Sequence, residues 1–215
     1  DPMAVQSRGP SGARRRLLRG VVALPWLSAL GPGAAWAARP ARIVSLGGAL
    51  TEVVYLLGAQ GQLVGTDTTS LFHDAALKTA KVGYMRQLSA EGLLALQPDA
   101  VVGTTEAGPP VVLDQVRSAG VRVELVQADH TWDEVRRKVA TVGRVAGRER
   151  EAQALQADLD AQWAAVQKQV AAATRRPRAI FILSHGGSPM VAGTGTAADA
   201  LIRFAGATNA ITQFA

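Results

Sequence analysis

A tyrosine and an arginine two positions apart are the side chains of this sequence with the clearest capacity for chemistry. They are Tyr84 and Arg86, in the segment 81–99, KVGYMRQLSAEGLLALQPD. In extended backbone this spacing places both side chains on the same side. A guanidinium beside a phenol favours the ionised phenolate, whose oxygen is a good ligand for a hard trivalent cation. Tyrosine oxygen is also one of the axial ligands that haem iron accepts.

The Tyr84 loop leads into a short helix with clear signals at both ends. Ser89 is predicted to be its N-cap, Glu91 lies in its first turn, and Pro98 ends it. Its apolar face is predicted to consist of Leu93, Leu94 and Leu96.

Strands and helices alternate on both sides of this loop. Apolar, β-rich runs predict strands at 42–46, 63–65, 100–103 and 121–126, and helices are predicted at 51–57, capped by Thr51 and closed by Gly58, and at 111–119. The alternation is typical of a doubly wound parallel α/β sheet, whose loops at the carboxyl ends of the strands are offered to a ligand. Glu106 and Gly108 lie in such a loop, after 100–103, and are therefore candidate residues of the rim of the site.

The pattern becomes helical after residue 130. Thr131 or Asp133 is predicted to cap a helix that runs to about Ala146 and is broken by Gly147. Residues 148–173 contain no Gly or Pro and carry one apolar stripe. A single helix of that length runs on the order of 40 Å, enough either to pack along one domain or to reach from one lobe to another.

A second α/β pattern begins near residue 177. It predicts a strand at 179–183, a glycine-rich loop at 184–196 and a helix at 197–204. His185 lies at the start of this loop and is interpreted either as a metal or haem ligand or as a loop histidine bonded to backbone. His73 and His130 are interpreted as loop residues of no special role.

The composition indicates an ordinary globular protein. Of 215 residues, 48% are hydrophobic and 19% charged, and the absence of cysteine excludes disulfides and thiolate metal sites. Five of the 23 basic residues and one of the 17 acidic residues lie before Ala38, which leaves 18 and 16, a net charge of +2. The overall charge of +6 is therefore no argument for nucleic-acid binding, and we expect that the protein does not bind nucleic acid.

The first 37 residues have the features of a secretory signal. A basic stretch, 14–19, precedes an apolar run, 21–30, and Ala35-Trp36-Ala37 is a small-residue cleavage site. The apolar run is too short to span a membrane. We therefore predict export to the periplasm and cleavage near Ala37, by either the general secretory or the twin-arginine route.

Two stretches carry a resemblance to a known family. VGYMRQLSAEGLLALQPDAVV and, upstream, RIVSLGGALTEVVYLLGA resemble the periplasmic haem-binding proteins of bacterial haem ABC importers. These belong to the helix-backbone class of substrate-binding proteins, which also includes cobalamin and ferric-siderophore binders. The resemblance implies two doubly wound α/β lobes joined by a long backbone helix, with haem b (hemin) held between them.

The resemblance also assigns roles to individual residues. It implies that Tyr84 ligates the haem iron, that Arg86 supports the phenolate, and that Glu91 pairs with arginines of the inner-membrane permease, which works with an ATPase. Some haem binders of the family use a histidine of the second lobe, for which His185 is the candidate. Glu106 and Gly108 are expected to shape the rim.

The implied domain plan has four parts. They are a signal peptide (1–37), an N-terminal lobe (38–130), a helical segment with the backbone helix (131–176), and the start of a C-terminal lobe that is expected to be truncated at Ala215 (177–215). We expect a monomer. We also expect that the protein is not an enzyme, because the phosphate-binding motifs G-x-G-x-x-G and G-x-x-x-x-G-K-[ST] and the nucleophile motif G-x-S-x-G do not occur. The alternative function is a ferric-siderophore or cobalamin binding protein of the same class.

Overall fold

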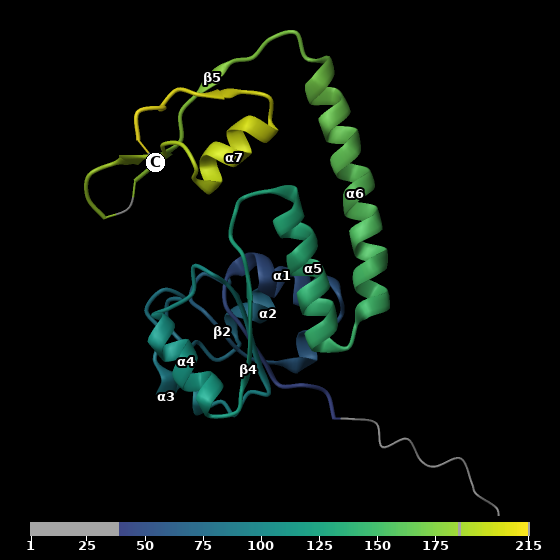
Figure 1. Ribbon diagram of the computed structural model, residues 1–215, viewed down its shortest axis with the longest axis vertical. Helices are drawn as coiled ribbons and strands as arrows, with labels where there is room; N and C mark the ends of the chain where they lie inside the picture. Colours follow the sequence, from purple (N-terminus) through teal and green to yellow (C-terminus); the bar gives the residue numbers. More distant parts are fainter. Residues whose placement is uncertain (1–38, 185, 215) are drawn as a thin grey trace, which may run out of the picture. The chain divides into compact units, whose positions relative to one another are not determined.

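A computed structural model describes residues 39–184 and 186–214 of the chain (Figure 1). The predicted signal peptide (1–37) and the candidate ligand His185 therefore lie outside the described residues. None of the helices described is both long enough and apolar enough to cross a membrane.

Four parallel strands form the sheet that the sequence predicts. Their order across the sheet is β2-β1-β3-β4, and their bounds are β1 (Ile43–Ser45), β2 (Leu63–Thr66), β3 (Ala100–Thr104) and β4 (Arg122–Val126). All four strands point the same way, so the loops that follow them leave from one edge of the sheet. The prediction of a doubly wound α/β lobe is confirmed.

Helices cover both faces of this sheet, and the alternation of side chains along the strands assigns each residue to a face. Ile43 and Val102 pack in one core with α1 and α5, whereas Val44 and Val101 pack in the other core with α3 and α4. The helices of this region are α1 (Gly48–Leu56), the 3-10 helix η1 (Gln60–Gln62), α2 (Asp74–Leu77), α3 (Ala90–Leu94), α4 (Pro110–Ser118) and α5 (Trp132–Ala146). The β3 strand is buried along its whole length, as a strand covered on both faces must be.

The first helix begins earlier than predicted. Gly47, with φ at 101°, occupies the N-cap position, and Thr51 lies inside α1. The Thr51 hydroxyl donates to the Ser45 hydroxyl (2.9 Å) and shares a hydrogen bond with the Ser70 hydroxyl (2.8 Å). The prediction of Thr51 as a cap is therefore wrong, because the buried hydroxyl is taken by side chains distant in sequence.

Helix α5 begins with two connected polar contacts. Thr131 is its N-cap, and its hydroxyl accepts from the Glu134 backbone N–H (3.2 Å). The buried Glu134 carboxylate accepts from the backbone N–H groups of Asp129 (2.8 Å) and His130 (2.6 Å) and pairs with Lys138 (2.6 Å). Burial alone raises the pKa of the Glu134 carboxyl, but the bonds from Lys138, His130 and Asp129 outweigh it and leave this pKa below its ordinary value of 4.5.

The long predicted helix is α6 (Glu149–Ala172). Its 24 residues extend about 36 Å at 1.5 Å per residue. Its first half lies alongside α5 (Figure 1), where Leu155 and Leu159 pack against the core. Farther along, Trp163 stacks on Trp132 of α5 (centroids 4.6 Å apart) and meets Phe204 edge-on (5.0 Å).

The segment after α6 is less regular than predicted. Strand β5 (Arg178–Ala179) pairs in parallel with β8 (Thr208–Asn209), whereas β6 (Ile182–Leu183) pairs antiparallel with β7 (Met190–Val191). The prediction of one strand at 179–183 is therefore wrong, because residues 178–179 pair with β8 whereas residues 182–183 pair with β7. The predicted glycine-rich loop at 184–196 is interrupted by β7. Helix α7 (Ala197–Phe204), capped by Thr196, is confirmed.

We predict that the close approach of α5 and α6 tolerates no side chain at Gly143. A Cβ atom there would lie 2.5 Å from Ala152 Cβ and 3.3 Å from the Arg148 carbonyl oxygen. Gly143→Ala should therefore lower the free energy of unfolding by about 1–3 kcal/mol despite alanine's better helix propensity. Urea denaturation measures this. The control is Gly61→Ala, whose Cβ meets nothing within 4 Å and should change stability by at most about 0.5 kcal/mol. Equal stability of both variants would show that the helices are not tightly packed.

We also predict an acid-dependent loss of stability that originates at Glu134. Since folding lowers this pKa from 4.5, the carboxylate contributes stability above that pH, and the contribution is lost as the pH falls through the folded value. Glu134→Gln should reduce stability at pH 7 by about 1–2 kcal/mol and flatten the decline below pH 4.5. Unfolding curves from pH 3 to 7 measure both effects. Glu149→Gln, an exposed glutamate, is the control, and an acid decline as steep in Glu134→Gln as in the wild type would contradict the assignment.

Candidate ligand-binding site

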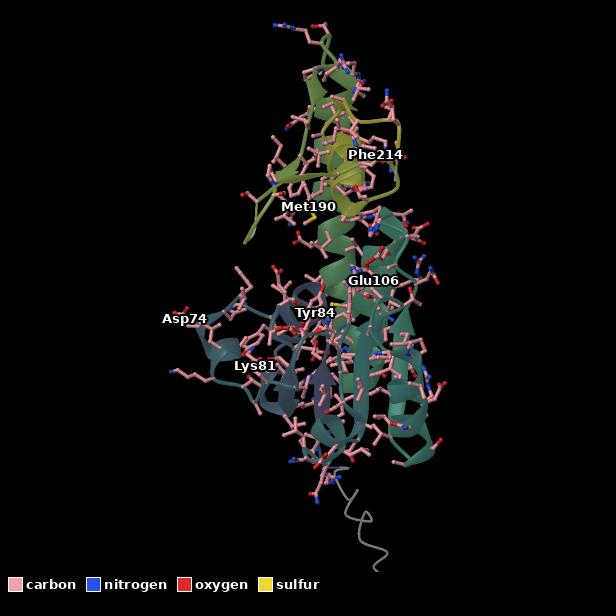
Figure 2. The ribbon with its side chains drawn as sticks, turned by 90° about the vertical axis from the view of Figure 1, so that its left-hand side faces the viewer. Asp74, Lys81, Tyr84, Glu106, Met190 and Phe214 are labelled. Carbon is pink, nitrogen blue, oxygen red and sulfur yellow. The ribbon has the colours of Figure 1, made fainter. Side chains whose placement is uncertain are left out.

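The candidate residues gather at the carboxyl edge of the parallel sheet. Tyr84 follows β2 by way of the α2 segment, and Glu106 and Gly108 follow β3. Figure 2 shows the labelled side chains Tyr84 and Glu106 at the same end of this lobe. The topology therefore joins two loops that the sequence separates by about twenty residues.

The Asp67 carboxylate fastens the first two loops of this edge. Asp67 is fully buried. It accepts from the backbone N–H of Gly47 (2.9 Å), from the backbone N–H (3.0 Å) and hydroxyl (2.5 Å) of Thr69, and from the Ser70 hydroxyl (2.7 Å). The loop after β1 and the loop after β2 are therefore held together by one side chain.

The Lys81 side chain holds the chain that leads into the Tyr84 loop. Its ammonium donates to the Thr66 hydroxyl (2.8 Å) and to the carbonyl oxygens of Ala76 (3.0 Å) and Ser70 (3.2 Å). Backbone bonds continue the attachment, from Val82 N–H to the Thr66 carbonyl and from Thr68 N–H to the Gly83 carbonyl (both 3.0 Å). The segment before Tyr84 is thus fixed to the end of β2.

Tyr84 begins a tight turn rather than an extended segment. The Gln87 N–H donates to the Tyr84 carbonyl (2.8 Å). The assumption of extended backbone between Tyr84 and Arg86 is therefore wrong. The Tyr84 side chain is 41% exposed. Its loop is bonded to the next one, since Gly108 N–H donates to the Met85 carbonyl (2.9 Å) and Leu88 N–H to the Gly108 carbonyl (3.0 Å).

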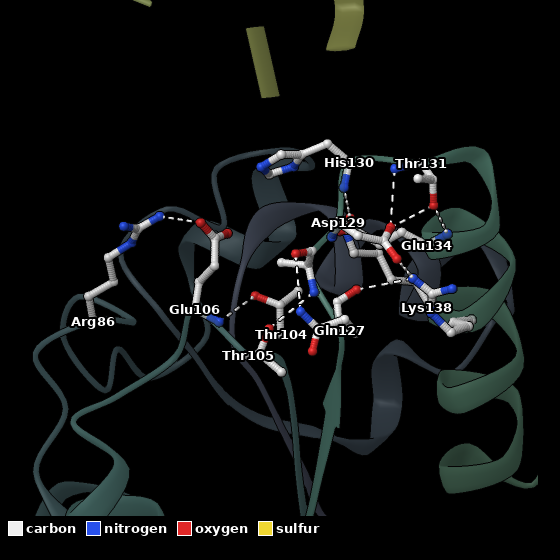
Figure 3. A network of polar contacts seen from close by, with 12 residues as sticks. Arg86, Thr104, Thr105, Glu106, Gln127, Asp129, His130, Thr131, Glu134 and Lys138 are labelled. Atoms are coloured by element: carbon white, nitrogen blue, oxygen red, sulfur yellow. Dashed lines mark hydrogen bonds and ion pairs between the residues drawn. The ribbon is translucent and has the colours of Figure 1, made fainter. Parts of the chain in front are cut away.

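Arg86 pairs with Glu106 across the two loops. The guanidinium Nη2 lies 2.5 Å from the carboxylate Oε1 (Figure 3). Within the described part of the chain, no hydrogen bond joins Arg86 to the Tyr84 hydroxyl. Both side chains of the pair are substantially exposed, so solvent screens their attraction. The structure brings Tyr84, Arg86, Glu106 and Gly108 together, while the role of Arg86 toward the phenolate stays a prediction.

A small cavity opens between these loops. It has a volume of about 160 Å³ and is lined by residues that include Gly47, Gly48, Thr69, Met85, Glu106 and Lys138. Pockets that enclose a drug-sized ligand measure roughly 300–1,000 Å³. The cavity is therefore too small to enclose a ligand of that size.

A larger cavity of about 480 Å³ lies between α5 and α6, away from Tyr84. Its two arginines already have partners, because Arg136 pairs with Asp133 and Asp160, and Arg144 pairs with Glu124. None of the candidate residues Tyr84, Arg86, Glu106 and Gly108 lines it. We therefore place the site at the sheet edge.

Glu91 lies at the start of α3, just after the Tyr84 loop. The Ser89 hydroxyl accepts from Gly92 N–H (3.0 Å), which confirms Ser89 as the N-cap. The helix ends at Leu94, earlier than predicted, and of its predicted apolar face only Leu93 is fully buried. Glu91 is exposed, and no ion pair engages it in residues 39–184 and 186–214.

The sequence reasoning missed Asp67 and Lys81 as the residues that build the edge. Asp67 did carry a signal, since an aspartate followed by Thr and Ser residues is typical of side-chain-to-backbone turns. Lys81 carried no such signal in the sequence. Its acceptors are mostly backbone carbonyl oxygens, which every residue type has.

Known proteins resemble this chain in sequence and in fold. A family described as "Periplasmic binding protein" matches residues 43–214. The periplasmic heme-binding protein BhuT, solved with two hemes, is 43% identical, with a TM-score of 0.76 over 81% of this chain and 68% of that one. A periplasmic heme-binding protein from Pseudomonas aeruginosa is 38% identical, with a TM-score of 0.73 over 81% of this chain and 64% of that one.

Curated relatives include binders of another tetrapyrrole. The vitamin B12-binding protein of Pectobacterium carotovorum is 30% identical over 124 residues, which are 56% of this chain and 45% of that protein. The chain spans less than half the length of the curated relatives it matches.

The family match extends from the first strand of the sheet almost to the end of the chain, and the fold agrees with that of the two solved relatives over 81% of this chain. This chain belongs to the periplasmic binding protein family, in the helix-backbone class whose solved members include periplasmic haem-binding proteins.

Proposed function

We propose that this protein binds haem in the periplasm and delivers it to an inner-membrane ABC importer. The observation that carries the proposal is the half-exposed phenol of Tyr84, held on a hydrogen-bonded rim at the carboxyl edge of the sheet. The two haem-binding relatives, at 43% and 38% identity, support it. The protein acts as a monomeric carrier, and no bond-making chemistry is part of the function.

The residues of the edge fit ferric haem. Fe(III) is a hard cation, and a phenolate oxygen suits it as an axial ligand. Arg86 provides positive charge two residues from Tyr84, and its exposed ion pair with Glu106 contributes at most about 1 kcal/mol, so the guanidinium can turn toward the phenolate at little cost. Glu106 and Gly108 form the adjoining rim, and His185 is a candidate contact from the second α/β segment.

Cobalamin is the second candidate ligand, because a vitamin B12-binding protein is among the relatives. The two ligands make different demands on Tyr84. Haem takes an axial ligand from the protein, for which the Tyr84 phenolate is suited, whereas cobalamin carries its own axial groups on cobalt. The phenol oxygen of Tyr84 therefore discriminates between the two functions.

We predict that purified protein titrated with hemin shows saturable binding and a high-spin ferric spectrum of the tyrosinate type. Tyr84→Phe removes only the phenol oxygen and should therefore abolish that spectrum. Because the iron loses its axial ligand, hemin affinity should fall at least about tenfold, which corresponds to about 1.4 kcal/mol. The control is Tyr55→Phe, the other tyrosine of the chain, whose ring stacks on His73 at 4.4 Å.

A parallel titration with cobalamin separates the candidates. Saturable binding of cobalamin without binding of hemin would replace the proposed ligand. Tight hemin binding with an unchanged spectrum in Tyr84→Phe would move the iron ligand to another residue, His185 first.

We further propose that Glu91 pairs with an arginine of the permease. Its exposure and its place beside the ligand edge support this role, since a docking carboxylate must be free of partners in its own chain. Glu91→Ala should leave hemin affinity unchanged and lower haem-stimulated ATP hydrolysis by the reconstituted transporter several-fold. Glu149→Ala, another exposed glutamate in the first turn of a helix, is the control. Full stimulation by Glu91→Ala would remove this residue from the interface.

A further inference from the structure

The loop after β4, residues 127–131, leaves the sheet at the same edge as the Tyr84 and Glu106 loops. It contains His130, interpreted from the sequence as a loop residue of no special role. Figure 3 shows this loop and the Arg86–Glu106 pair within one network of polar contacts. The position of His130 thus makes it a candidate part of the site.

The backbone of His130 is held in a conformation that non-glycine residues rarely adopt. Its φ is +55°, in the left-handed region, which costs of order 1 kcal/mol or more for such a residue. Its N–H and that of Asp129 both donate to the buried Glu134 carboxylate (2.6 and 2.8 Å). The Asp129 carboxylate in turn pairs with Arg137 (2.6 Å) and accepts from the Thr131 hydroxyl (2.6 Å). Several contacts therefore fix the place where the imidazole stands.

The same loop is bonded to the rim that carries Glu106. Ala128 N–H donates to the Thr105 hydroxyl (3.1 Å), and Thr105 N–H donates to the Val126 carbonyl (2.9 Å). Glu106, the next residue, bonds to Arg86. His130 is consequently positioned with respect to Arg86 through a short series of hydrogen bonds.

The imidazole itself is the uncommitted group of this network. It is half-buried, and neither ring nitrogen has a hydrogen-bond partner among residues 39–184 and 186–214. In Figure 3 the ring lies at the upper rim and is directed toward the side on which Glu106 and Arg86 stand. The carboxylates nearest to it in sequence, Asp129 and Glu134, are already satisfied by Arg137 and Lys138.

His73 provides the contrast within the same chain. Its φ is also positive, at 67°. Its ring, however, stacks on Tyr55 (4.4 Å, 17° between planes) and contacts Phe72 edge-on (4.5 Å). Packing accounts for His73, whereas nothing in the described residues accounts for the ring of His130.

We propose that His130 contacts the bound tetrapyrrole by donating a hydrogen bond from its imidazole to a carboxylate at the edge of the ligand. The proposal rests on the proposed haem-binding function. Tyr84 and His130 project from loops of one sheet edge, so both approach the ligand from the same lobe. The imidazole therefore reaches the periphery of the ring, where haem carries its two propionates, while the iron is left to Tyr84.

The test compares hemin with hemin dimethyl ester, in which both carboxylates are esterified. His130→Ala should weaken hemin binding about tenfold, the loss expected for one hydrogen bond to a charged acceptor, and leave binding of the ester unchanged. His130→Gln, which keeps a donor, should recover most of the hemin affinity. His73→Ala is the control and should bind both ligands like the wild type. The tyrosinate-type spectrum should persist in every variant.

Two results would overturn the proposal. One is unchanged hemin affinity in both His130 variants, and the other is an equal loss for hemin and its ester, which would exclude recognition of the carboxylate. Both results compare the affinity of a variant with that of the wild type, so they require a wild type that binds hemin. Failure of the proposed function is a different result, in which the wild type itself does not bind hemin. Urea unfolding midpoints of the His130 variants, expected to match the wild type, confirm that the affinities belong to folded protein.

Discussion

The buried carboxylate of Asp67 is the interaction on which the candidate site depends. Four donors from Gly47, Thr69 and Ser70 converge on it, and they belong to the loops after two neighbouring strands. A buried carboxylate is stable only when such bonds replace its hydration, and loop donors at a sheet edge are equally costly to leave unpaired. One side chain thus satisfies both requirements and sets the base from which the Lys81 and Tyr84 segment is built.

Above this base the site combines a rigid backbone with loosely held side chains. The loops of Tyr84, Glu106 and His130 are joined through backbone and hydroxyl bonds, whereas the Arg86–Glu106 ion pair is exposed and screened. A carrier has to bind its cargo and later release it. Fixed positions favour binding, because little order must be created when the ligand arrives, and weak ion pairs allow charged groups to change partner.

The fold alone does not decide the ligand, because a solved haem-binding protein and a solved vitamin B12-binding protein both share it. The decision rests with a few side chains at the sheet edge. The phenol oxygen of Tyr84 suits a ligand whose ferric iron has an open axial position. The imidazole of His130, which has no partner in the described residues, suits a ligand with carboxylates at its edge. Both features support the proposal of haem, and they are separable by substitution because they concern different parts of that ligand.

The sequence by itself determined the order of the four strands and of the longer helices of the lobe, the cap Ser89, the end of α5 at Gly147 and the length of α6, because these depend on local periodicity and on residues a few positions apart. It left the cap of α5 open between Thr131 and Asp133, and the structure selects Thr131. The sequence also singled out Tyr84 and Arg86, by their residue types, their spacing and the family resemblance, and Glu106 and Gly108, by the rule that loops at the carboxyl ends of parallel strands face a ligand. Only the tertiary structure decided that Arg86 turns to Glu106, that Thr51 binds Ser70 and does not cap α1, and that the segment after residue 177 divides between two partners. It alone showed that Asp67 also binds Gly47 and that the loop of His130 is bonded to Thr105. These contacts join loops far apart in the chain, and local pattern carries no information about such contacts.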